Sequence, residues 1–211
     1  MYPARSAREH RYLALFLAAY YTAFTAWAAI AGNAEFIFYA IIVAALIWFI
    51  LSIDRRVHFS RPVLWSLAIL GLLHMAGGNI DLAPRWADGE QDAVLYDLRA
   101  RPYLPRYDHV VHAYGCFIAA IASYQIIAPT VARRRRAGWV LAGMCAMVAM
   151  GLGAANETIE FIATRFMETN VGRYENTGWD LMANATGALA GALVLRFRWR
   201  DIDARTRPAA G

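Results

Sequence analysis

The chain has 211 residues, of which 59% are hydrophobic, and its mean hydropathy is +0.34. An ordinary soluble domain is about 45–50% apolar, so this composition argues against a soluble protein and favours an integral membrane protein. The formal net charge is +5, and every basic side chain is an arginine. These arginines lie between apolar runs rather than in one basic patch, which indicates a signal for membrane topology and no nucleic-acid partner.

Six apolar runs are long enough to cross a membrane as helices, which requires roughly 20 residues. They lie near residues 12–32, 35–53, 62–80, 109–129, 138–163 and 178–197. We therefore expect an all-α polytopic membrane protein, a bundle of about six transmembrane helices that forms a single membrane domain over residues 1–211. A cleaved signal peptide is the alternative for the first run, although this run exceeds the usual length of such a segment.

The longest connection covers residues 81–107 and is rich in aromatic and proline residues. It has the composition of a segment at the membrane interface. The sequence leaves open whether it lies on the lipid surface or folds over the helical bundle.

The arginines are distributed unevenly over the connections. Most of the 21 precede the first run or follow the second, fourth and sixth runs. By the positive-inside rule these connections are cytoplasmic. We therefore predict cytoplasmic N- and C-termini, an extracytoplasmic loop 81–107, and a multi-pass protein of the bacterial inner membrane.

Polar and ionisable side chains interrupt four of the apolar runs, in each case at the predicted extracytoplasmic end. Such groups are costly inside a membrane and usually have a function. They are His74, Asn79 and Asp81 in the third run, Asp108, His109 and His112 in the fourth, Asn156, Glu157 and Glu160 in the fifth, and Asp180 and Asn184 in the sixth. With a rise of 1.5 Å per residue, His74, His112 and Glu157 lie roughly 20 to 28 Å from the cytoplasmic edge of the hydrocarbon core. The four helices are thus predicted to build one polar site.

The residue types in this site are those that bind divalent metals. Asp108 and His112 are four residues apart and share a helix face, as do Asp180 and Asn184. Imidazole and carboxylate ligands suit zinc, iron or manganese, and a cation would relieve the repulsion between several carboxylates. We expect metal ligands from His74, Asp108, His112, Glu160 and Asp180, catalytic groups from Asp108, His112, Glu157, Glu160 and Asp180, and substrate contacts from Asn79, Arg173 and Asn184.

Each cluster also has a structural interpretation. Asp108 is placed to cap a helix N-terminus, Glu157 to pair with Arg165 or Arg173, and Asp180 with Asn184 to make hydrogen bonds between helices. Cys116 and Cys145 lie within apolar runs and are expected to be packing residues. The glycines at 77, 78, 115, 151 and 153 are expected to allow close helix approach around the site.

The C-terminal half of the chain resembles the VanZ-like family of bacterial membrane proteins and the related YjdF family. The stretch DHVVHAYG, with Asp108 and His112, resembles the family's Asp-x-x-x-His helix start, and NETIEFI, with Glu160, its glutamate-bearing span end. The final motif is matched by Arg173, Asp180, Asn184, Gly187 and Gly191. His109 and Ala163 stand where relatives often have Lys and Gln. The resemblance implies a membrane protein of the cell envelope and a glycopeptide antibiotic as one ligand class.

Three functions are compatible with these features. The first is a metal-dependent hydrolase or transferase that acts on a lipid or lipid-linked head group. The second is a non-catalytic protein that binds an envelope lipid, a glycopeptide antibiotic or a partner protein. The third is a small transporter, although no charged group lies near the middle of a predicted span, where a relay would need one. A purely structural role for the polar residues is the remaining alternative.

Overall fold

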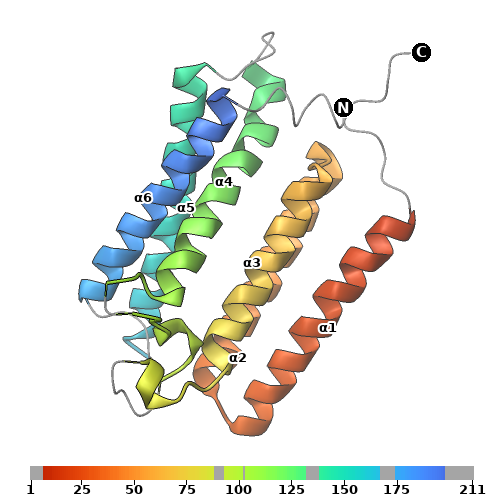
Figure 1. Cartoon of the computed structure of the whole chain (residues 1–211). Coiled ribbons are helices and arrows are strands. Elements are labelled where there is room, and N and C mark those ends of the chain that lie inside the picture. Colours follow the sequence, from red (N-terminus) through yellow and green to blue (C-terminus); the bar gives the residue numbers. More distant parts are fainter. Residues whose placement is uncertain (1–6, 88–92, 102, 132–137, 167–173, 198–211) are drawn as a thin grey trace.

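The computed structural model describes residues 7–87, 93–101, 103–131, 138–166 and 174–197. Six long helices lie side by side along a common direction (Figure 1). They are α1 (Ala7–Ala31), α2 (Ala34–Val57), α3 (Arg61–Asn79), α4 (Tyr107–Val131), α5 (Trp139–Ala163) and α6 (Tyr174–Phe197). Extended pairing in the described part of the chain is confined to one antiparallel bridge, between Asp81 and Val94. The expected all-α architecture is confirmed.

Five of these helices, α1 to α5, are long and apolar enough to cross a membrane. The sixth, α6, has 24 residues, which corresponds to a length of about 36 Å. It is more polar than the others, and its polar residues Asp180 and Asn184 are buried against neighbouring helices rather than turned outward. The chain is therefore a polytopic membrane protein in which five helices are apolar enough to be spans by themselves, and the polar sixth packs alongside α4 and α5.

Helix α4 occupies the centre of the bundle, packing against α6 and α5 on one side and α3 on the other. Helices α4 and α6 approach each other closely because α6 has glycines at the contact. A Cβ at Gly187 would lie 1.8 Å from the carbonyl oxygen of Ala113, and one at Gly191 would lie 2.9 Å from that of Phe117. Gly151 does not have the expected role, because nothing lies within 4 Å of a Cβ placed there.

The turn between α2 and α3 is fixed by polar contacts at one end of the bundle. The Asp54 carboxylate accepts a hydrogen bond from the backbone N–H of Phe59, at 2.8 Å. The backbone N–H of Ser60 donates to Gln125 Oε1 on α4, also at 2.8 Å, and Gln125 Nε2 donates to Ser60 Oγ. These bonds satisfy buried polar groups and attach the α2–α3 pair to the centre of the bundle.

At the opposite end, the connection between α3 and α4 folds back onto the helices (Figure 1). Two short 3-10 turns, η1 (Pro84–Trp86) and η2 (Leu95–Asp97), shape it. Arg106 pairs with Asp97 at 3.2 Å, and the Tyr96 side chain lies against Gly77 of α3. Of the two arrangements left open for loop 81–107, its described residues adopt the one that folds over the bundle.

Candidate metal centre

The polar residues of α4, α5 and α6 converge at the end of the bundle that the α3–α4 connection covers, and His74 of α3 lies beside them. Their carboxylates are buried: Asp180 is 0% exposed, Asp108 and Glu157 are each 6% exposed, and Glu160 is 9% exposed. Ionisable side chains of membrane helices usually face the interior of the bundle rather than the lipid. The predicted meeting of the helix ends is therefore present for α4, α5 and α6.

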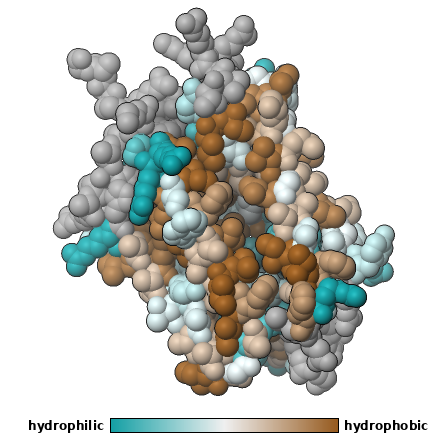
Figure 2. Space-filling view, turned by 180° about the vertical axis from the view of Figure 1, so that it is seen from behind, coloured by the Kyte–Doolittle hydropathy of each residue, from teal (hydrophilic) through white to brown (hydrophobic). Residues whose placement is uncertain are grey.

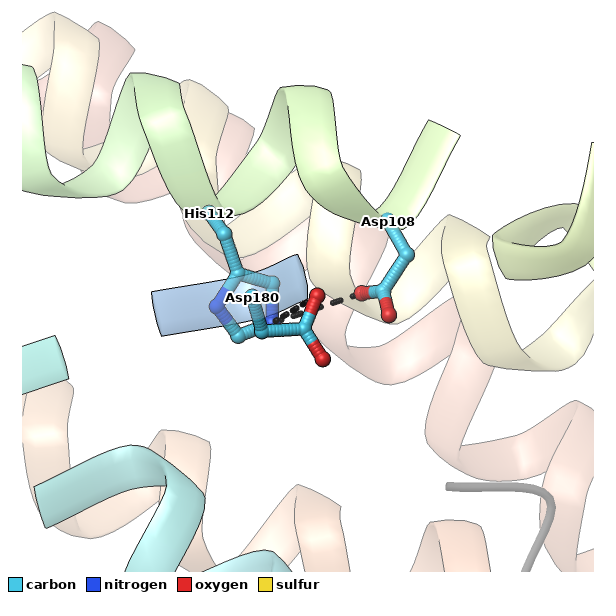
Figure 3. A group of neighbouring side chains, drawn as sticks. All are labelled: Asp108, His112 and Asp180. Carbon is cyan, nitrogen blue, oxygen red and sulfur yellow. Dashed lines mark ion pairs between the residues drawn. The ribbon is translucent and has the colours of Figure 1, made fainter. Parts of the chain in front are cut away.

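His112 lies at the centre of this cluster and has carboxylates near both ring nitrogens. Its Nε2 is 3.4 Å from Asp108 Oδ1 and 3.9 Å from Asp180 Oδ1 (Figure 3). Its Nδ1 is 3.3 Å from Glu157 Oε1. Asp108 precedes His112 by one helical turn, which is why the two share a face of α4. Asp180 comes from α6, brought close by the contact at Gly187.

Asn176 orients the two aspartates. Its Nδ2 donates to Asp180 Oδ2 at 2.6 Å and to Asp108 Oδ2 at 3.4 Å. Both Oδ1 atoms are thereby left facing His112 Nε2. Asp180 Oδ1 has no hydrogen-bond partner among the described residues, although it is fully buried. Such an oxygen is costly unless a proton or a cation satisfies it.

The three atoms on this side of His112 match the spacing that a metal ion requires. Asp108, His112 and Asp180 each offer one ligand atom, and these atoms lie within 4.8 Å of one another. Two ligands of one tetrahedral zinc ion, each about 2.1 Å from the metal, are about 3.4 Å apart. The separations of 3.4 and 3.9 Å from His112 Nε2 are close to this value. Three protein ligands would leave the fourth position of a tetrahedral site open.

A second group of potential ligands lies on the other side of the same imidazole. His112, Glu157 and Glu160 also offer atoms within 4.8 Å of one another. Glu160 Oε1 accepts a hydrogen bond of 2.7 Å from Asn156, whereas Glu157 Oε1 lies 3.3 Å from His112 Nδ1. With a metal on Nε2, His112 Nδ1 would carry the proton and face Glu157, the usual arrangement of a metal-bound histidine backed by a carboxylate.

His109 adjoins the centre and contacts Asp180 in a different way. Its Nδ1 accepts a hydrogen bond of 3.3 Å from the backbone N–H of Arg106. In the neutral ring the proton is therefore on Nε2, which lies 3.9 Å from Asp180 Oδ1. The ring stacks on Trp179, with centroids 6.2 Å apart. His109 thus presents a donor to Asp180 rather than a free lone pair to a metal.

Several predicted site residues lie beside the centre rather than in it. His74 is outside both groups of potential ligands, because its Nδ1 contacts the Tyr96 hydroxyl at 2.8 Å; its ring centroid is 6.4 Å from that of His112. Asn79 donates to the carbonyl of Met75 on its own helix. Asn184 lies deeper and accepts from Cys116 Sγ at 3.1 Å. Arg173 lies outside the described residues.

The structure also bears on the structural interpretations. The side-chain contacts of Asp108 are to His112 and Asn176, so it belongs to the cluster. No ion pair joins Glu157 to Arg165 among the described residues. The Asp180–Asn184 pair is split between two environments, the His112 cluster and the Cys116 thiol. Cys116 is therefore a hydrogen-bonding residue as well as a packing residue.

Two residues of the site were not singled out from the sequence. Asn176 lies one turn before Asp180. The sequence predicts that the last helix begins near residue 178, which leaves Asn176 outside it, whereas α6 begins at Tyr174. Tyr96 lies in the long connection, with its hydroxyl donating to the His74 carbonyl at 3.0 Å. Burial raises the pKa of the Tyr96 phenol well above its usual value, with neighbouring acidic groups adding to the effect. The four-residue spacing between Asn176 and Asp180 is a signal that could have identified Asn176. No feature of the sequence marks Tyr96 as part of the site.

The fold and the cluster define a class of protein: a polytopic helical membrane protein with a buried histidine–carboxylate centre at one end of its bundle. Residues 13–201 match the model of the family described as "Predicted membrane protein (DUF2238)", so the chain belongs to that family. Comparisons with curated proteins and with solved structures returned no match.

Proposed function

We propose that the protein is a metal-dependent membrane enzyme that hydrolyses or transfers a lipid or lipid-linked head group at the extracytoplasmic face. The observation that carries this proposal is the surrounding of His112 by Asp108 and Asp180 at one ring nitrogen and Glu157 at the other. Buried charges of one sign are unfavourable unless they are compensated. A divalent cation at Nε2 would compensate the two aspartates and satisfy the unpartnered Oδ1 of Asp180.

In this proposal Asp108, His112 and Asp180 hold zinc, iron or manganese. A metal so bound supplies Lewis acidity and lowers the pKa of a bound water towards 7. Glu157 holds the Nδ1 proton of His112, and Glu160, kept in place by Asn156, accepts or returns a proton. His74, fixed by Tyr96, lies within reach of a substrate between α3 and α4.

A lipid head group is the favoured substrate because of where the centre lies. It is close to the end of membrane-spanning helices rather than in a separate domain, so a head group can reach it while the rest of the lipid stays at the level of the hydrocarbon. The resemblance to VanZ-like and YjdF proteins supports a role in the bacterial cell envelope. Non-catalytic binding of a lipid or glycopeptide by the same residues is the second candidate.

Elemental analysis of the detergent-purified protein tests the metal centre. We expect about one divalent metal per chain in the wild type, and its loss in the Asp180→Asn and His112→Ala variants. Glu175→Gln is the matched control, because Glu175 is an exposed carboxylate on the same helix as Asp180. Absence of metal from the wild type after incubation with zinc, manganese and iron salts would overturn the proposal, as would equal metal content in Asp180→Asn.

Turnover is measured next, with phosphatidylglycerol and an isoprenoid pyrophosphate in vesicles as probes. Release of a head group by the wild type and its loss in Asp180→Asn would support the enzyme. A metal-loaded protein that binds these lipids without releasing a product would favour the non-catalytic alternative.

A further inference from the structure

A cavity of about 360 Å³ lies between the two halves of the bundle, with residues of all six helices in its walls. Its size is within the range of small-molecule sites in proteins. The half-exposed side chains Leu46 and Phe49 of α2 and Leu152 of α5 line it, so it opens sideways between these two helices. On a membrane-spanning bundle this opening faces the acyl chains of the bilayer.

The side of the molecule opposite to the view of Figure 1 is largely apolar where this opening lies. Brown and tan side chains dominate the middle of that face in Figure 2, and strongly hydrophilic ones lie towards its margins. Helices α2 and α5 lie behind α3 and α4 in Figure 1. The cavity is therefore bordered by a surface that suits contact with lipid rather than with water.

The walls of the cavity change in character along its length. The polar side chains His74, His112, Asn156 and Asn184 belong to the end near the metal centre. Most of the remaining lining is aliphatic or aromatic, contributed by α1, α2, α3 and α4. A ligand that satisfies both parts must have a polar group at one end and a long apolar part at the other.

The length of the cavity fits one acyl chain. On α4 its lining extends from Val111 to Ile126, which spans roughly 22 Å along the helix. The hydrocarbon of one leaflet is about 15 Å thick, half of a core of about 30 Å. A chain with its head at His112 would therefore fit entirely between the helices.

From these observations we infer that the cavity holds an acyl chain of a membrane lipid, which enters between α2 and α5 and places its head group against His74 and His112. The inference rests on the proposed function for the chemistry at the head group. It narrows the substrate to a lipid with an acyl chain that can leave the bilayer and enter the cavity. His112 connects the cavity with the candidate metal centre, because its ring lines the cavity while its Nε2 faces Asp108 and Asp180.

Photo-cross-linking tests this assignment directly. The probe is a phosphatidylglycerol with a diazirine near the end of one acyl chain, in vesicles that contain the full-length protein. Cys116 and Ser123 line the cavity but are each only 4% exposed, so bulk lipid does not reach them. We expect the wild type to be labelled on α4 near Ser123, which lies about 17 Å beyond His112 along the helix, as located by peptide mass spectrometry.

Two variants that place a ring in the cavity, Ala155→Phe and Ala119→Phe, make the test specific. Ala155→Phe places a ring at the lining of α5, and Ala154→Phe is its matched control, because Ala154 is exposed on the same helix and does not line the cavity. Each methylene kept out of the cavity weakens binding about fourfold, so labelling of α4 should fall at least about tenfold in Ala155→Phe and remain unchanged in the control. Ala119→Phe, about 10 Å beyond His112 on α4, should remove labelling at Ser123.

Equal labelling of the two α5 variants, or no labelling of α4 in the wild type, would overturn the assignment. The result is separable from the metal centre, because Asp180 does not line the cavity. Asp180→Asn should lose its metal and keep its labelling. Labelling without any metal in the wild type would refute the proposed function alone, and metal without labelling would refute the acyl site alone.

Discussion

The amide of Asn176 controls the geometry of the centre, because one NH₂ group holds the Oδ2 atoms of both Asp180 and Asp108. Asn176→Ala should leave both carboxylates free to rotate away from His112. Loss of such an outer partner typically weakens metal binding about 10- to 100-fold, and titration of the metal-depleted protein measures this change. Thr186→Ala, an exposed change on the same helix, should leave the affinity unaltered. Equal affinities for the two variants would mean that Asn176 does not orient the ligands.

The individual residues of the centre could be predicted from the sequence in part. Asp108 and His112 were predictable because a separation of four residues on a helix fixes their proximity. The proximity of Asp180 required only that ionisable groups turn away from lipid. The displacement of His74 could not be predicted, since it depends on a tyrosine 22 residues away in an irregular connection.

Among the elements, the contact between α4 and α6 depends most on residue size. A Cβ at Gly187 would meet the Ala113 carbonyl oxygen at 1.8 Å, and a backbone atom cannot move aside without moving the helix. Gly187→Ala should therefore lower stability by about 1–3 kcal/mol or more, as overpacking does. Thermal unfolding in detergent measures the effect. Gly151→Ala is the matched control, and a helical Gly→Ala change in open space should be neutral or stabilising by up to about 1 kcal/mol.

The α3–α4 connection is held to the bundle by Tyr96, which bonds both the ring and the carbonyl of His74. Tyr96→Phe removes these bonds and should make the connection more susceptible to limited proteolysis, at a cost of about 1 kcal/mol. Tyr103→Phe, at an exposed position of the same connection, should leave the rate of cleavage unchanged. A rate that is equal in the two variants would contradict the anchoring role.

The raised pKa of Tyr96 gives this anchor a pH dependence of known sign. The phenol is protonated in both folded and unfolded states below its usual pKa of about 10. Above that value the unfolded or detached connection loses the proton and the folded one keeps it, so attachment weakens as pH rises. Protection from proteolysis should hold up to about pH 10 and decline above it in the wild type. The decline should be smaller in Tyr96→Phe.

The helices themselves were predictable to within a few residues, because the apolar runs are long and their ends are marked by arginine, proline and glycine. The start of α6 was less clear, since its first turn, from Tyr174, is polar and resembles the loop before it. That difference of one turn is what concealed Asn176. The packing of the connection onto the bundle, by contrast, leaves no periodic pattern in the sequence.

For the whole molecule, the property with the largest consequence for function is its orientation in the membrane. The arginine distribution predicts that the turn between α2 and α3 and the start of α5 are cytoplasmic, and that the connection carrying Tyr103 is outside. The centre around His112 lies at the end with Tyr103. If the prediction is right, the proposed centre meets outer-leaflet lipids; if the orientation is inverted, it meets lipids of the cytoplasmic leaflet.

Single cysteines report this orientation, because the native Cys116 and Cys145 are buried and should not react. Tyr103→Cys introduces a thiol at a position that is 75% exposed, and a membrane-impermeant maleimide should label it in intact spheroplasts. Gly138→Cys lies at the exposed start of α5, where nothing is within 4 Å of a Cβ, and should be labelled only after the membrane is permeabilised. The reverse pattern would place the candidate metal centre on the cytoplasmic side and exclude outer-leaflet head groups as its proposed substrates.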